Sequence, residues 1–261
     1  MADFILVAGG WLGGWAWRDV AHELVRRGHR AVPVTLTGLG DRRHLAHPGV
    51  GLGTHVADVV QVIDHEEVSD AVLVGHSYGI FPVVGAADRR PGRIGRVVHL
   101  DTGVPQDGDT VAGSFMDEAR RAAVQEIVAG QGDGWLYPPQ PTDRPEWWGS
   151  LDGLDEAARA RLARLAAAHP YRCFTEPVAL TGAVGRLPAT AVLCTGSGVS
   201  VAGIEAAYAA GDPVLADAAD RKVTFFELAT GHYPMLSTPG PLAEVLLDAA
   251  AGRGHRLGTG H

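Results

Sequence analysis

The feature that most constrains the fold of this chain is a Gly-x-Ser-x-Gly motif, residues 75–79, between a strand pattern and a helix pattern. Residues 71–74 before it are apolar and rich in β-branched side chains, and residues 80–87 after it favour a buried helix. A serine on such a sharp turn needs small neighbours, and the two glycines of the motif supply them. The turn would expose the hydroxyl and aim the first helix amides at its target. The pattern therefore predicts Ser77 as a nucleophile, against the alternative of a plain glycine-rich turn.

A serine hydroxyl needs a base, and the chain offers 12 histidines. His232 follows the strand-like run 223–228 and a short turn, and an amphipathic helix pattern follows it. A loop histidine after the last strand of an open sheet can reach a nucleophile at the same sheet edge. The other histidines fall in polar or amphipathic segments, in the nucleophile turn itself (His76), in an apolar strand or in the C-terminal tail. The sequence therefore predicts His232 as the base.

Strand patterns alternate with helix patterns along most of the chain. Strand-like runs lie near residues 4–7, 30–34, 71–74, 96–101, 190–194 and 223–228. Helix-like runs lie near residues 15–27, 54–66, 80–88, 201–210 and 242–251. Such alternation predicts an α/β fold with a mainly parallel, doubly wound sheet of about six strands, right-handed crossovers and helices on both faces.

The stretch from about residue 102 to residue 187 breaks this alternation. It contains helix-like runs near 114–129 and 155–168 and two aromatic, proline-rich stretches, with no strand pattern between them. We therefore expect a helical cap inserted after the strand that follows the nucleophile turn. The predicted domains are a core of residues 1–101 and 188–251, the cap of residues 102–187, and a flexible C-terminal tail of residues 252–261.

Composition favours a compact enzyme that does not bind polyanions. The 261 residues are 46% hydrophobic and 20% charged, and the net charge of −8 argues against binding to nucleic acid or anionic membranes. The 2 cysteines are too few for a disulfide framework. Asp3 stands where a secretory signal would be basic, and no apolar run reaches membrane-spanning length. We expect a cytoplasmic protein, and the single lysine among many arginines suggests a GC-rich bacterial genome.

Two competing motifs fail on inspection. A dinucleotide-binding fingerprint would need a glycine at Ala8 and an acid after the second strand, where residues 35–37 carry none. A zinc helix beginning at His65 would need a second histidine at ligand spacing. We therefore expect neither a metal nor a cofactor.

The nucleophile turn, the late Gly231-His232 pair and a glycine loop after the first strand together resemble the α/β-hydrolase superfamily, over residues 4 to about 250. The loop of residues 8–17 is similar to the His-Gly-Ala-Trp loop of small esterases and hydroxynitrile lyases, the branch that contains plant methyl-salicylate esterases. Residues 33–42 fit the same branch. Ala8 stands where that loop usually has histidine. The resemblance implies an oxyanion hole formed by the backbone N–H groups of Gly10 and Tyr78.

The carboxylate that should orient His232 is not at its usual place. In the superfamily it usually follows the penultimate strand, but the expected position here is Gly198, and residues 195–200 contain no acid. Asp101 stands at the carboxyl end of the strand near 96–101. Some members, including certain haloalkane dehalogenases, carry their acid after this strand. We expect Asp101 to be the catalytic acid, against the alternative that it only caps the following turn.

The resemblance implies a serine hydrolase that cleaves a small, largely apolar carboxylic ester, thioester or lactone through an acyl-enzyme. A cyclase or lyase could use the same triad on a natural-product, polyketide-like intermediate. A non-catalytic small-ligand receptor on the same fold is the third reading, and the missing acid after Cys194 supports it. Hydroxynitrile lyases of this branch carry lysine and threonine where this chain has Tyr233 and Gly9, so cyanohydrin cleavage is disfavoured.

The substrate pocket is expected to be aromatic. We expect it to be lined by Trp11, Trp135, Trp147, Trp148 and Tyr233, although Trp147 and Trp148 could equally be core residues of the cap. The predicted partner is a small-molecule substrate, with no nucleic acid and no membrane, and a homodimer is left open.

Overall fold

A six-stranded parallel sheet forms the centre of the protein, in the order β2-β1-β3-β4-β7-β8. The structure, a computed structural model, describes residues 1–258. The strands are β1 (Asp3–Val7), β2 (Arg30–Val34), β3 (Ala71–His76), β4 (Ile94–Leu100), β7 (Ala189–Cys194) and β8 (Thr224–Leu228). Each matches a predicted strand to within about two residues at either end. The predicted mainly parallel sheet of about six strands is therefore confirmed.

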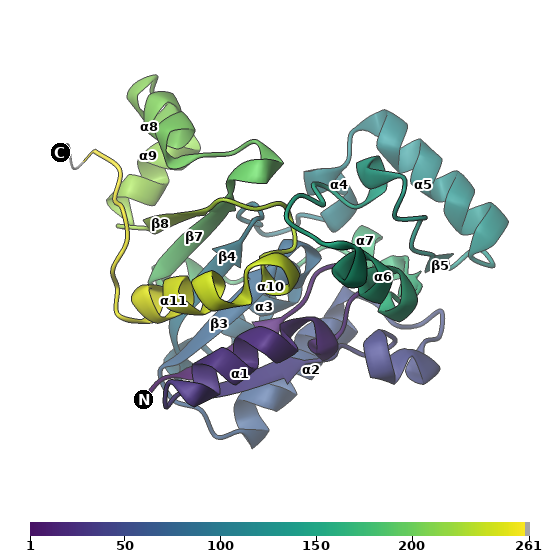
Figure 1. Ribbon diagram of the computed structural model, residues 1–261, viewed down its shortest axis with the longest axis horizontal. Helices are drawn as coiled ribbons and strands as arrows, with labels where there is room; N and C mark the ends of the chain where they lie inside the picture. Colours follow the sequence, from purple (N-terminus) through teal and green to yellow (C-terminus); the bar gives the residue numbers. More distant parts are fainter. Residues whose placement is uncertain (259–261) are drawn as a thin grey trace.

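Helices cover both faces of the sheet because its strands are apolar on both sides. Along β1, Ile5 and Val7 join one buried cluster, whereas Phe4 and Leu6 join the other. The first cluster packs against α2 (Leu52–His65) and α3 (Ile80–Arg89), and the second packs against α1 (Arg18–Arg26) and α11 (Pro239–Ala250). Figure 1 shows α1 and α11 side by side across the sheet.

The cap segment, defined as residues 102–187, lies beside the sheet at the right of Figure 1. Its helices are α4 (Val111–Phe115), α5 (Glu118–Gln131), α6 (Glu156–Leu165) and α7 (Arg172–Thr175). It contributes Val124 and Cys173 to one buried cluster and Leu162 to the other. The cap segment and the sheet therefore share their apolar interior.

Two expectations for the cap segment are wrong. The single helix near 114–129 is two helices, because Met116 is extended and the Asp117 side chain accepts the Arg120 N–H to start α5 afresh. The absence of strands is also wrong. Leu136–Tyr137 (β5) pairs antiparallel with His169–Pro170 (β6). Strands of two residues are too short to produce an alternating pattern.

The remaining helices lie near the carboxyl end of the chain. They are α8 (Val201–Ala209), α9 (Pro213–Asp220) and the one-turn α10 (Pro234–Ser237), and only α8 follows from the sequence patterns. The expectation of a loose tail is wrong for residues 252–258. His255 exchanges both backbone hydrogen bonds with Phe225 of β8, and Leu257 is buried. The rest of that predicted tail, residues 259–261, lies outside the described part of the chain.

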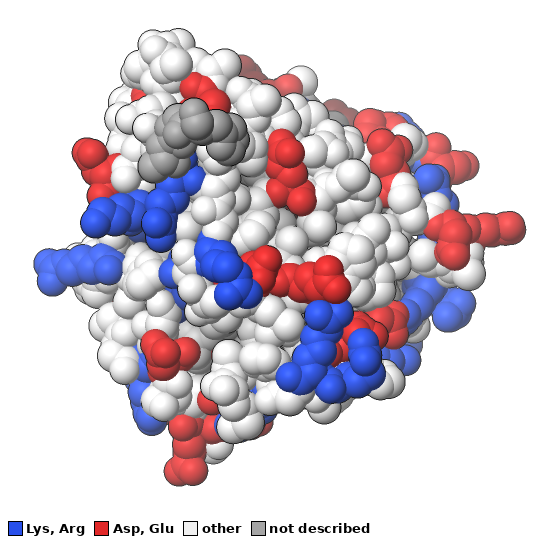
Figure 2. All heavy atoms as spheres, turned by 60° about the vertical axis from the view of Figure 1, so that its left-hand side comes forward, with Lys and Arg blue, Asp and Glu red and all other residues white. Residues whose placement is uncertain are grey.

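The surface carries charges of both signs. On the face drawn in Figure 2, basic and acidic side chains are interspersed and separated by uncharged surface. This face therefore offers a polyanion no continuous basic surface. None of the helices within residues 1–258 combines the length and the apolar character needed to cross a bilayer.

Candidate active site

Ser77 sits on a strained turn between β3 and α3, with a φ of 51°. Both glycines of the motif are required by close backbone contacts. A Cβ on Gly75 would lie 2.6 Å from the Cα of Ile80, and one on Gly79 would lie 2.6 Å from the carbonyl oxygen of Ala8. Such strain persists only where surrounding structure enforces it, and it is common at functional sites. The local geometry is that of a nucleophile elbow.

Strand register places Asp101 level with Ser77. The last pair between β3 and β4 is His76 with Leu100, so Ser77 and Asp101 leave adjacent strands at the same height. The backbone of Asp101 is also in the left-handed region, with a φ of 47°. The chain therefore turns sharply at both residues, and both line one cavity.

The Asp101 carboxylate accepts three hydrogen bonds. Its Oδ2 lies 2.6 Å from His232 Nδ1 and 2.7 Å from the Ser197 hydroxyl, and its Oδ1 accepts the Cys194 N–H at 3.1 Å. Burial alone would raise the pKa of Asp101, but these bonds, that from His232 first, outweigh burial and lower the pKa below its usual value. An ionised carboxylate at Nδ1 fixes the proton there and leaves Nε2 of His232 as the acceptor.

The His232 backbone is held from two sides. Its carbonyl oxygen accepts a 2.6 Å hydrogen bond from Nε2 of His76, the residue directly before Ser77. Its N–H donates to the carbonyl oxygen of Ser150 in the cap segment at 2.8 Å. Burial, followed by the neighbouring His232, lowers the pKa of His76 to about 3, so its ring is neutral at ordinary pH. The histidine loop is therefore anchored to both the elbow and the cap segment.

Two backbone N–H groups, those of Gly10 and Tyr78, are the candidates for an oxyanion hole. Within residues 1–258 the Gly10 N–H has no hydrogen-bond partner, and Tyr78 lies in the first turn of the 3₁₀ helix Ser77–Gly79, where N–H groups lack partners inside the helix. Both residues line the same cavity as Ser77 and His232. A Cβ on Gly9 would lie 2.8 Å from His76 Nδ1, so only glycine lets this loop approach the elbow so closely.

The cavity has a volume of about 1000 Å³ and lies between the sheet edge and the cap segment. Of the five aromatic residues expected in its wall, Trp11, Trp147, Trp148 and Tyr233 do line it. Trp135 does not, and this expectation is wrong: Trp135 lies on the β5 side of the cap segment, where its carbonyl oxygen accepts the Tyr171 N–H. The other lining residues include the aromatic Tyr137, Phe115 and Phe174 and the charged Asp117, Arg120 and Glu146, so the wall combines aromatic and charged side chains.

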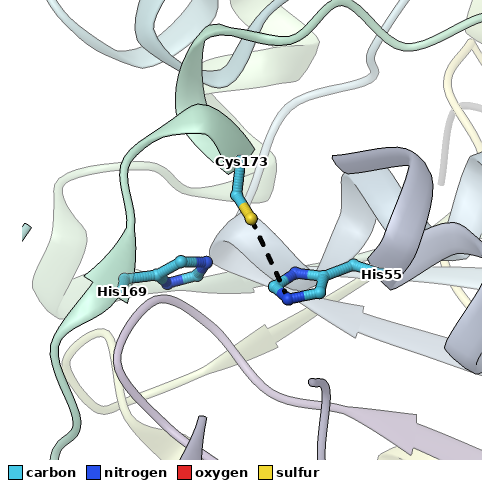
Figure 3. A group of neighbouring side chains, drawn as sticks. All are labelled: His55, His169 and Cys173. Carbon is cyan, nitrogen blue, oxygen red and sulfur yellow. Dashed lines mark hydrogen bonds between the residues drawn. The ribbon is translucent and has the colours of Figure 1, made fainter. Parts of the chain in front are cut away.

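His55, His169 and Cys173 form a buried group (Figure 3). Within the described residues it is the one cluster with metal-ligand spacing. Its potential ligand atoms lie within 4.8 Å of one another. Burial raises the pKa of Cys173 to about 12, which keeps the thiol protonated at neutral pH.

Hydrogen bonding does not suit this group to a metal. His55 Nε2 faces the carbonyl oxygen of Thr37 at 2.8 Å and must carry a proton, while its Nδ1 accepts from the Tyr78 hydroxyl at 2.7 Å. His169 Nδ1 accepts the Trp11 N–H at 3.3 Å. If Nε2 of His169 bound a metal, Nδ1 would have to carry the ring proton and could no longer accept this hydrogen bond. The cluster is therefore better described as a neutral hydrogen-bonded core.

Comparison with known proteins shows the family of this chain. The model of the alpha/beta hydrolase family matches residues 4–245. The chain belongs to this family. This alpha/beta hydrolase also resembles, with a TM-score of 0.77, the structure of an extracellular alpha/beta-hydrolase from a Paenibacillus species, covering 96% of this chain and 99% of that one. The two sequences are 21% identical, so the likeness bears on the fold.

Curated relatives match part of the chain. Over 111 residues it is 48% identical to the carbendazim hydrolyzing esterase of Nocardioides sp. (strain SG-4G), a match covering 42% of this chain and 46% of that protein. Over 106 residues it is 31% identical to methylesterase 9 of Arabidopsis thaliana, covering 40% of this chain and 41% of that protein. Each match spans less than half of the relative's length.

Four residues around the site do not stand out in the sequence. His76 and Ser197 contact His232 and Asp101, and their one sequence signal is position, beside Ser77 and after the penultimate strand. Ser150 and His169 reach the site only through tertiary contacts of the cap segment. Sequence patterns carry no signal for such contacts.

Proposed function

We propose that this protein is a serine esterase that cleaves small, largely apolar carboxylic esters through an acyl-enzyme on Ser77. The observation that carries the proposal is the 2.6 Å contact between His232 Nδ1 and Asp101, beside the strained turn that holds Ser77. A base that is oriented by a carboxylate, in the same cavity as a half-buried serine, has the arrangement of a catalytic triad.

In the proposed reaction, Ser77 Oγ attacks the ester carbonyl carbon while Nε2 of His232 takes its proton. Asp101 stabilises the imidazolium, and the Gly10 and Tyr78 amides donate to the oxyanion. His232 then protonates the departing alkoxide, which leaves as the alcohol. Water, deprotonated by His232, attacks the acyl carbon and releases the acid and free Ser77.

The aromatic side chains in the cavity wall support an apolar acyl group, because they bind such groups by burial of apolar surface. The names of two relatives, a methylesterase and a carbendazim hydrolyzing esterase, support methyl esters and carbendazim as the first substrates to try. The missing acid after Cys194 gives some weight to the alternative of a non-catalytic receptor, whereas the contact between the Asp101 carboxylate and His232 supports an enzyme.

The test combines turnover with covalent labelling. Wild-type protein should hydrolyse p-nitrophenyl acetate and at least one aromatic methyl ester, and a fluorophosphonate should label it once. Ser77→Ala should lose both properties and keep the fold, because alanine fits the turn. Ser114→Ala, at an exposed cap serine, should keep both. Residual turnover within tenfold of wild type in Ser77→Ala would exclude Ser77 as nucleophile. Labelling without hydrolysis of any ester would point instead to a lyase or cyclase.

A further inference from the structure

Trp11, next to the proposed oxyanion donor Gly10, has a left-handed backbone with a φ of 64°. Bulky residues rarely adopt this conformation, because Cβ crowds the backbone. Its persistence requires contacts that hold the residue in place. The contacts of Trp11 therefore show what maintains the shape of this loop.

Three hydrogen bonds hold Trp11, and all come from the cap segment. Its N–H donates to Nδ1 of His169 at 3.3 Å, and its carbonyl oxygen accepts the Ala167 N–H at 2.9 Å. Its indole N–H donates to the carbonyl oxygen of Tyr137 at 3.0 Å. Tyr137 and His169 are themselves partners in the β5–β6 pair. The β5–β6 pair therefore holds the Trp11 backbone through His169 and the Trp11 side chain through Tyr137.

The orientation of the Gly10 N–H depends on these contacts of Trp11. Gly9 and Gly10 have no side chains that could fix their conformation. A Leu12 N–H to Gly9 carbonyl bond of 3.3 Å closes the turn, and the Trp11 peptide lies within it. If Trp11 relaxed to a right-handed conformation, the turn would reopen and the Gly10 N–H would rotate.

His169 also contacts the second donor residue. Its ring lies edge-on to the Tyr78 ring, with centroids 4.5 Å apart. The side chain is fully buried and extends toward His55 and Cys173 (Figure 3). Burial holds its pKa well below the usual value, so Nδ1 remains an acceptor at neutral pH. His169 therefore contacts the side chain of one proposed donor residue, Tyr78, and the backbone of Trp11, which directly follows the other, Gly10.

We propose that His169 is a positioning residue for the oxyanion hole: by accepting the Trp11 N–H from the cap segment, it holds the Gly10 amide in its donating orientation. The inference rests on the proposed esterase function. The cap segment then does more than enclose the substrate, because it completes the catalytic machinery. An oxyanion hole acts on the transition state, so His169 should affect kcat more than KM.

A matched pair of amides tests this role. In His169→Asn the side-chain oxygen can occupy the place of Nδ1 and accept the Trp11 N–H, whereas in His169→Gln the amide extends to the place of Nε2. Loss of one oxyanion donor costs about 10²–10³ in kcat, so partial misplacement should cost His169→Gln about tenfold or more. KM should stay within about twofold. His169→Asn should recover most of the loss.

The control is Arg161→Ala, which removes a different contact between the cap segment and the core. Arg161 donates to the Trp15 carbonyl oxygen at 3.1 Å and does not contact Trp11. Hydrogen exchange of the peptide containing residues 9–12 should become faster in His169→Gln and stay unchanged in Arg161→Ala. This readout does not depend on turnover, and His169→Ala provides a second loss-of-acceptor variant if His169→Gln does not fold.

The outcomes separate the two proposals. If wild type hydrolyses no ester, the proposed function fails, and the exchange of residues 9–12 alone decides whether His169 holds the loop. If wild type is active but His169→Gln and His169→Asn lose kcat equally, or exchange in the loop does not change, His169 is only a packing residue and the inference is overturned.

Discussion

His232 Nδ1 and Asp101 Oδ2 are 2.6 Å apart, although the residues are separated by 131 positions in the chain. The carboxylate comes from the end of β4, and the turn after β7 supplies the Ser197 hydroxyl to the same oxygen instead of an acid. Gly198, where the superfamily resemblance places the acid, has a φ of 88°, which any other side chain would strain. The turn after β4 therefore supplies the carboxylate that contacts His232, and the turn after β7 supplies a hydrogen bond to that carboxylate.

The first prediction concerns Asp101→Asn. The amide keeps the shape of the side chain but stabilises the wrong histidine tautomer, and the same change in a serine protease costs about 10⁴ in kcat. The control is Ser197→Ala, which removes one hydrogen bond and keeps the charge, so its loss should be at most about tenfold. Steady-state kinetics with p-nitrophenyl acetate measures both. A rate within tenfold of wild type in Asp101→Asn would show that Asp101 only caps its turn.

The sequence predicts the sheet and the elbow because both depend on local patterns. Apolar runs of strand length and the spacing of two glycines around Ser77 are visible without tertiary structure. Asp101 follows from its place at a strand end, once the turn after Cys194 lacks an acid. These inferences need only the order of the parallel strands.

The cap segment is where sequence reasoning fails. The β5–β6 pair is too short for an alternating pattern, and Trp135 was indistinguishable by sequence from the tryptophans that do line the cavity. The contact of His169 with Trp11 joins residues 158 positions apart, and a left-handed tryptophan has no sequence signature. Such features arise from packing between the cap segment and the sheet. The division into core and cap domains, the cytoplasmic location and the partners stay predictions.

The second prediction concerns the pH dependence of stability. Burial lowers the pKa of His99 from 6.5 to about 4. Below about pH 6.5 the unfolded chain binds a proton there and the folded protein does not, so the free energy of unfolding falls as pH falls toward 4. The slope is about 1.4 kcal/mol per pH unit for one such group. Burial lowers the pKa of His55 to about 4 as well, and it should act in the same direction.

Urea denaturation between about pH 7 and pH 5 measures this slope. His99→Gln should be less stable at neutral pH, because it loses the 3.1 Å hydrogen bond to Gly103, but its stability should depend less on pH. Gln61→Ala, which changes an exposed side chain without a titratable group, should leave the slope unchanged. Equal slopes in His99→Gln and wild type would mean that His99 is protonated at a similar pH in both states.

The last prediction concerns His76, which joins the elbow to the histidine loop. Its Nε2–H donates to the His232 carbonyl oxygen at 2.6 Å, so removal of the donor should let His232 drift from Ser77. The net value of such a hydrogen bond is about 1 kcal/mol, which corresponds to roughly a fivefold loss of kcat.

In His76→Gln the amide NH₂ can take the place of Nε2–H, whereas in His76→Leu no donor remains. We expect His76→Leu to lose about fivefold in kcat with little change in KM, and His76→Gln to lose less. Thermal unfolding of both variants separates this effect from general destabilisation. If His76→Gln loses as much kcat as His76→Leu at equal stability, the ring acts by its shape, and the hydrogen bond to His232 contributes nothing to catalysis.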